Sequence, residues 1–139
     1  MIDRLNRDER LAMMELLWYI AKTDGNTPEV YQELLREYAE LLEVDPGEID
    51  GELTPEELVP QFQNPASRVV VLQEVFRLAQ LDGVFTIGEE SVILDIASLM
   101  GFPMEFVQRV EQWVIDGIEW TLKGEKLIDE SRRIVLRKA

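Results

Sequence analysis

The sequence contains no cysteine and no histidine. These absences exclude disulfide bonds, thiolate chemistry, imidazole metal ligands and any catalytic triad built on an imidazole base. Basic residues are scarce too, because 14 lysines and arginines stand against 28 aspartates and glutamates, which gives a net charge of −14. Such a chain repels nucleic acid and anionic lipid surfaces. Cations and basic proteins are its natural ligands.

Long apolar runs are also missing. The stretch from Val69 to Leu72 is four residues long, whereas a membrane-spanning helix needs roughly 20. The charged segment from Met1 to Asp8 lacks the apolar core of a secretory signal. We therefore expect a cytoplasmic protein without direct membrane insertion. With 139 residues, 46% of them hydrophobic, the chain is expected to form a single domain over residues 1–139 with one core.

Apolar residues recur with the 3.6-residue period of helices, which predicts an all-α fold with about seven helices. The expected helices are 5–22, 28–42, 65–80, 87–100, 103–122 and 126–137, with short turns near 46–50 and 55–62. Capping residues precede prolines at four expected starts: Thr27-Pro28, Asp45-Pro46, Thr54-Pro55 and Asn64-Pro65. Thr54 to Glu57 and Thr86 to Glu89 also fit capping boxes. Gly101 and Gly124 are expected to end helices.

An internal repeat with an offset of 58 residues relates about 11–44 to about 69–102. Apolar positions of the first copy fall on apolar positions of the second, for example Met13 on Val71 and Leu35 on Ile93, and Asp24-Gly25 falls on Asp82-Gly83. Two copies are too few for an open solenoid. The repeat therefore predicts two helical hairpins, related by a pseudo-twofold axis and packed as a single bundle with the core between them.

Charge is distributed unevenly along the chain. Residues 24–57 contain twelve acidic residues and one basic residue, whereas residues 123–139 contain six basic and three acidic residues. The acidic segment is either a solvated helix face or a surface for cations or a basic partner. The tail predicts a basic C-terminal helix over about 125–139, whose apolar stripe either packs back across Trp120 or forms a docking surface.

The segment from Leu78 to Phe102 resembles the TerB-like family, which is named for tellurite resistance. Its pattern is an apolar helix ending in Ala-x-x-Asp-Gly, a capped start, a glutamate seven residues after the aspartate, and an apolar helix closed by glycine. The resemblance extends over roughly residues 10–122. It implies an all-helical duplicated fold, a link to tellurite or general stress responses, metal binding by acidic strips and scaffolding near the membrane. No reaction is firmly attached to the family.

The resemblance also implies a cation site, for which Ca²⁺ or Mg²⁺ would be the ion. Asp82 and Glu89 match the motif in the second copy and Asp24 matches it in the first, where Tyr31 replaces the glutamate and Glu33 lies nearby. Carboxylates from a turn and a helix start suit hard cations. The same residues are also explained as helix caps. Further candidates, for contact with a protein partner, are Glu29, Glu90 and Trp120.

Together these features predict a non-enzymatic binding or scaffold module whose protein partner is basic or membrane-associated. Two alternatives remain: a hydrolase-like enzyme that uses paired carboxylates, and a self-associating structural protein. The first would need two carboxylates with different pKa values in one cleft. Asp50-Gly51 resembles the middle of an EF-hand loop, but Pro46 occupies the position of the first carboxylate ligand.

Overall fold

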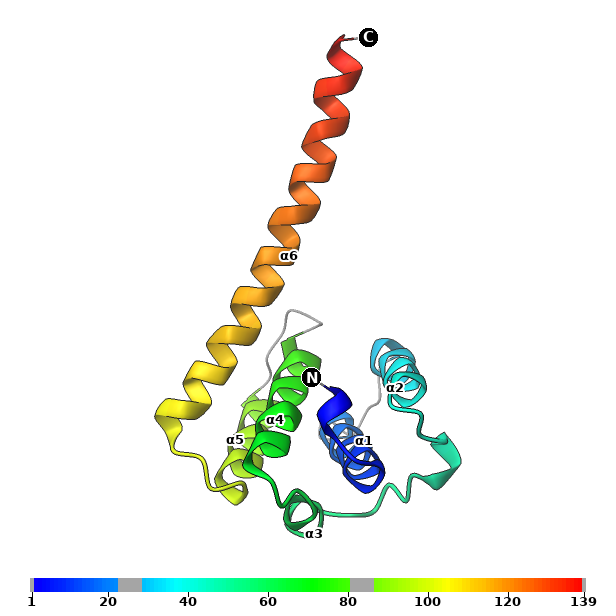
Figure 1. Ribbon diagram of the computed structural model, residues 1–139, viewed down its shortest axis with the longest axis vertical. Helices are drawn as coiled ribbons and strands as arrows, with labels where there is room; N and C mark the ends of the chain where they lie inside the picture. The colour runs from blue at the N-terminus through cyan, green and yellow to red at the C-terminus, as the bar shows by residue number, and fades with distance from the viewer. Residues whose placement is uncertain (1, 23–28, 81–86, 139) are drawn as a thin grey trace.

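The computed structural model describes residues 2–22, 29–80 and 87–138, and these residues form helices and 3₁₀ turns without any strand. The all-α prediction is confirmed. The α-helices, shown in Figure 1, are α1 (Arg7–Ala21), α2 (Glu29–Leu41), α3 (Pro55–Leu58), α4 (Pro65–Gln80), α5 (Ile87–Leu99) and α6 (Met104–Lys138). The 3₁₀ turns are Ile2–Arg4, Pro46–Glu48 and Val59–Gln61.

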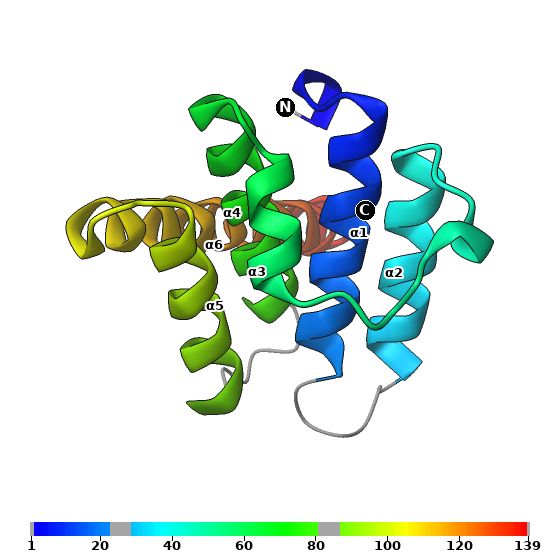
Figure 2. The ribbon, with the colours of Figure 1, turned by 90° about the horizontal axis from the view of Figure 1, so that it is seen from below.

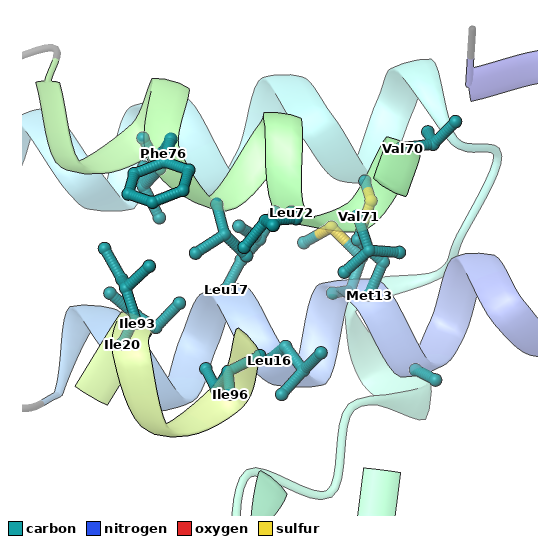
Figure 3. Close-up of a cluster of buried hydrophobic side chains, with 14 of the residues drawn as sticks. Met13, Leu16, Leu17, Ile20, Val70, Val71, Leu72, Phe76, Ile93 and Ile96 are labelled. Carbon is teal, nitrogen blue, oxygen red and sulfur yellow. The ribbon is translucent and has the colours of Figure 1, made fainter. Parts of the chain in front are cut away.

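The centre of the core lies between α1 and α4, which pack on each other. Met13 and Leu17 of α1 lie opposite Val71 and Leu72 of α4, and all four side chains are buried (Figure 3). Helix α2 packs on α1, α5 packs on α4 and α1, and the short α3 packs on α1 and α5 (Figure 2). Because α1 and α4 are apolar on most sides, each can take neighbours on several faces.

Positions 58 residues apart carry the same local structure, beginning with the helix starts. The side chain of Asn6 accepts a hydrogen bond from the amide of Glu9, and the side chain of Asn64 accepts one from the amide of Ala66, so each asparagine caps the first helix of its copy. Glu9 completes a capping box on Asn6. The sequence analysis predicted the Asn64 cap and missed the one at Asn6.

Two arginines 58 residues apart close the second helix of each copy. The Arg10 guanidinium donates to the carbonyl oxygen of Leu42 at 3.4 Å, and the Arg68 guanidinium donates to that of Met100 at 3.0 Å. Leu42 and Met100 follow the last residues of α2 and α5. Because the last carbonyls of a helix have no partner inside it, each arginine supplies a missing donor and joins the two helices of its copy.

The ends of α2 and α5 also share one backbone geometry. The amide of Val44 donates to the carbonyl of Ala39, and the amide of Phe102 donates to that of Ala97. This bond is typical of a Schellman motif, whose cap residue has a positive φ. That residue is Gly101 with φ 86° after α5, as predicted, but it is Glu43 with φ 59° after α2. The first copy therefore holds a non-glycine residue in a left-handed conformation that costs roughly 1 kcal/mol or more.

The predicted break at Gly124 is wrong, because α6 continues without interruption from Met104 to Lys138. A glycine inside a helix costs only about 1 kcal/mol relative to alanine, and the lysine and glutamate around Gly124 favour the helix. No proline follows to prevent continuation. Residues 125–138 of the basic segment therefore form the far end of a 35-residue helix that extends away from the bundle (Figure 1).

The predicted capping box at Thr54 is also not formed. Thr54 makes no side-chain bond to the backbone of α3, and its hydroxyl instead donates to the Glu57 carboxylate at 3.2 Å. Helix α3 is only four residues long. Its start is set by Pro55, whose fixed φ suits the first helical position.

Candidate functional site

The residues predicted to bind a cation fall only in part within the described structure. Asp24 and Asp82 lie outside the described residues, and Glu89 lies in the first turn of α5. Glu33 is exposed on α2. In Figure 2 the end of α1, the start of α2, the end of α4 and the start of α5 lie on one side of the bundle. Among the described residues, no three carboxylates come close enough together to hold a metal ion.

The outer face of α2 carries a row of carboxylates. Glu29, Glu33, Glu37 and Glu40 follow one another at spacings of three or four residues, so they share one side of the helix, and all four are exposed. Arg36 is the one basic residue in α2. Like charges at these spacings destabilise a helix slightly, and a cationic partner would relieve that repulsion. This row of four glutamates is called the acidic face below.

Behind the acidic face, α2 is joined to α4 by a buried polar contact that the sequence analysis missed. The Tyr38 hydroxyl donates to the Glu74 carboxylate at 2.5 Å, and both side chains are buried. The Arg77 guanidinium lies 3.8 Å from the same carboxylate. Burial raises the pKa of Tyr38, and the hydrogen bond to Glu74 and the negative charge of Glu74 raise it further. Tyr38 therefore stays protonated as a donor to Glu74.

The hydrogen bond between Tyr38 and Glu74 has no equivalent at the positions 58 residues away. The positions equivalent to Glu74 and Tyr38 are Leu16 of α1 and Ile96 of α5, which lie side by side in the core (Figure 3). An apolar contact on one side thus corresponds to a hydrogen-bonded pair on the other. In the sequence, this contact could have been anticipated from Glu74, which lies on the otherwise apolar face of α4.

The Asp50-Gly51 segment is held by α1. The Glu15 carboxylate accepts hydrogen bonds from the amides of Asp50 at 3.2 Å and Gly51 at 2.9 Å, and Lys22 donates to the Gly51 carbonyl. Gly51 has φ 81°, and a Cβ there would lie 3.3 Å from the Trp18 indole nitrogen. The positive φ favours glycine, and a side chain here would have to displace the Trp18 ring slightly. The EF-hand-like segment acts as a structural connection to α1.

Helices α5 and α6 bring two carboxylates near each other. Partial burial raises the pKa of Glu111 on α6, and the negative charge of Glu90 on α5 raises it further. Glu90 is exposed. Glu90 is one of the residues that the sequence analysis predicted to contact a partner.

Two of the open grooves on the described surface lie beside α4. One has a volume of about 410 Å³ between α4 and α6 and is mostly apolar, with Arg77, Trp113 and Gly117 in its lining. The other, of about 580 Å³, lies between the starts of α1 and α4 and is polar. Its Glu9 carboxylate already accepts from the Asn6 amide. The described lining of the apolar groove includes no carboxylate, whereas that of the polar groove includes Asp8 and Glu9.

No other part of the described structure covers the C-terminal half of α6. Residues 119–137 are all exposed, and Trp120 is 78% exposed. The apolar stripe of the tail therefore does not pack back across Trp120. In the described part of the chain, no helix combines the length and the apolar composition that a membrane span requires.

Comparison with protein-family models gives a match in the N-terminal part of the chain. The model of the family described as tellurite resistance protein TerB matches residues 1–54, which include α1, α2 and the first Asp-Gly pair. No curated protein and no solved structure matches the chain. The family match lies in the first copy of the repeat, whereas the fuller Asp-Gly motif lies in the second. The match to residues 1–54 supports the resemblance to the TerB family that the Asp-Gly motifs indicated.

Proposed function

We propose that the protein is a non-enzymatic binding module of TerB type that recognises a basic protein partner through the acidic face of α2. The observation that carries this proposal is the row of four exposed glutamates on one side of a helix. Because these four glutamates share α2 with a single basic residue, Arg36, they attract a basic surface and speed its association. The TerB match favours a role in tellurite or general stress responses.

A quantitative pull-down tests this proposal. Wild-type protein, the variant Glu33→Gln/Glu37→Gln and the control Asp95→Asn/Glu105→Gln are immobilised in parallel at low salt. The control removes the same number of exposed charges outside the acidic face, so it corrects for net charge. We expect basic proteins retained by the wild type and the control to be lost from the first variant. Equal retention by all three proteins would contradict the proposal.

The TerB motif also supports binding of a divalent cation by the residues around the two Asp-Gly pairs. Asp82 and Glu89 carry the complete motif, whereas the first copy has Tyr31 in place of the glutamate. Calorimetric titration with Ca²⁺ and Mg²⁺ should therefore show weaker affinity after Asp82→Asn/Glu89→Gln than after Asp24→Asn. Flat titrations of the wild type, or equal losses in the two variants, would contradict a cation site of this kind.

A further inference from the structure

Helix α6 presents an apolar face with no partner. From Trp113 onward, eight large apolar side chains are exposed. Six share one side of the helix, namely Trp113, Trp120, Leu127, Ile128, Ile134 and Val135, whereas Leu122 and Leu136 lie on the opposite side. Exposed apolar surface on this scale marks an interaction site, and a helix that projects into water gains little stability from its own hydrogen bonds. A partner on this face would stabilise the helix.

The spacing of this face fits a two-stranded coiled coil. Small residues recur every seven positions at Gly117, Gly124 and Ser131. Each is followed three residues later by a large apolar residue: Trp120, Leu127 and Ile134. Alternating steps of three and four residues place both sets on one seam, as in the core positions of a coiled coil. Apart from the adjacent residues and the backbone of α6 itself, no atom lies within 4 Å of a Cβ built at Gly117 or Gly124, so the seam is open.

The sizes of the seam residues favour an antiparallel partner of the same sequence. In a parallel pair, equivalent positions meet, so glycine would face glycine and tryptophan would face tryptophan. An antiparallel pair centred between residues 125 and 126 instead places Gly117 opposite Ile134, Ser131 opposite Trp120 and Gly124 opposite Leu127. Every layer then combines one small and one large side chain, which fills the seam evenly.

Charges beside the seam agree with this direction. Asp116, Lys123, Glu130 and Arg137 recur every seven residues with alternating sign, and all four are exposed. In the same antiparallel register, Asp116 faces Arg137 of the other copy and Lys123 faces Glu130. Both contacts join opposite charges, and flanking charges of this kind set the direction of helix pairing. A parallel pair would place these residues against the apolar flank that contains Ile128.

The apolar groove between α4 and α6 lies at one end of this seam. Its lining includes Trp113 and Gly117, and the antiparallel register brings Ile134 of the other copy opposite Gly117. The groove therefore accepts the end of the second helix. We propose that the partner of α6 is a second copy of this chain, paired antiparallel along residues 113–137.

Sedimentation equilibrium across the micromolar range tests the pairing. Leu127 lies on the seam and Leu136 lies on the opposite side of the helix, and their side chains are 66% and 74% exposed. Leu127→Glu should weaken dimerisation at least tenfold, about 1.4 kcal/mol, whereas Leu136→Glu should leave it within about twofold of the wild type. Because both positions are exposed, neither change disturbs the bundle. A monomeric wild type, or equal losses in both variants, would overturn the proposal.

A charge exchange tests the direction. Lys123→Glu and Glu130→Lys should each weaken the dimer by about threefold to tenfold, and the double variant should restore it, because residues 123 and 130 face each other only in the antiparallel register. The chain has no cysteine, so a spin label at Leu136→Cys gives one label per copy. The labels should lie about 30 Å apart along the helix axis. Labels side by side, no restoration, or a monomer that binds phosphatidylserine vesicles instead would each refute the antiparallel dimer.

Discussion

The buried contact between Tyr38 and Glu74 gives a sharp test of how the two copies are joined. Tyr38→Phe removes only the hydroxyl, which donates a hydrogen bond to the Glu74 carboxylate at 2.5 Å. Arg77 lies 3.8 Å away, which is beyond hydrogen-bond distance. Glu74 is 3% exposed, so water does not replace the lost donor. We expect the free energy of unfolding to fall by about 1.5–3 kcal/mol, the range for hydrogen bonds to charged groups.

A double-mutant cycle separates this contact from general packing. Glu74→Leu introduces the residue that occupies the equivalent position in α1, Leu16. In that background Tyr38→Phe removes a donor that no longer has an acceptor, so it should cost nothing or stabilise. Urea unfolding followed by circular dichroism at 222 nm measures all four proteins. The two changes should therefore be coupled by about 1.5–3 kcal/mol. Additive changes would refute this account of the contact.

Three further predictions concern pH and the helix ends. The native state keeps the Tyr38 proton above pH 10, where the unfolded chain loses it, so the free energy of unfolding should fall by up to about 1.36 kcal/mol per pH unit above pH 10. Urea unfolding at alkaline pH should show a shallower fall for Tyr38→Phe. Glu43→Gly should raise and Gly101→Ala should lower the free energy of unfolding by about 1 kcal/mol each, since both positions have a positive φ; equal signs in urea unfolding would contradict this. Arg68→Gln should cost about 1–3 kcal/mol because its guanidinium bonds two carbonyl oxygens, at 2.6 and 3.0 Å, whereas Arg7→Gln, at an exposed ion pair, should cost less than about 1 kcal/mol in thermal unfolding.

Local signals in the sequence predicted most of the helices. The pair Gly101 and Pro103 predicted the end of α5 because a glycine with positive φ and a proline both act within a few residues. Gly124 lacks a following proline, and the single-residue penalty was too small to stop α6. Helix ends are thus predictable where two local signals agree.

Contacts between distant residues were harder to predict. Arg10 and Arg68 are 58 residues apart, as are Asn6 and Asn64. The repeat was identified from its apolar positions, so these equivalent polar residues were missed. Following the same offset through polar residues would have found both. The bond between Tyr38 and Glu74 breaks the repeat, and nothing local in the sequence places α2 against α4. Glu29, Glu90 and Trp120, the predicted partner contacts, are exposed, and so is Glu33, a predicted cation ligand.

The role of the acidic face is tested most directly by hydrogen exchange on the chain alone and on the complexes recovered in the pull-down. Amide exchange reports local opening and slows where a partner covers and stabilises a helix. The account predicts slower exchange over α2 in the complex, and restoration of fast exchange when salt screens the charges. Unchanged exchange over residues 29–41 in a complex that protects other helices would contradict it.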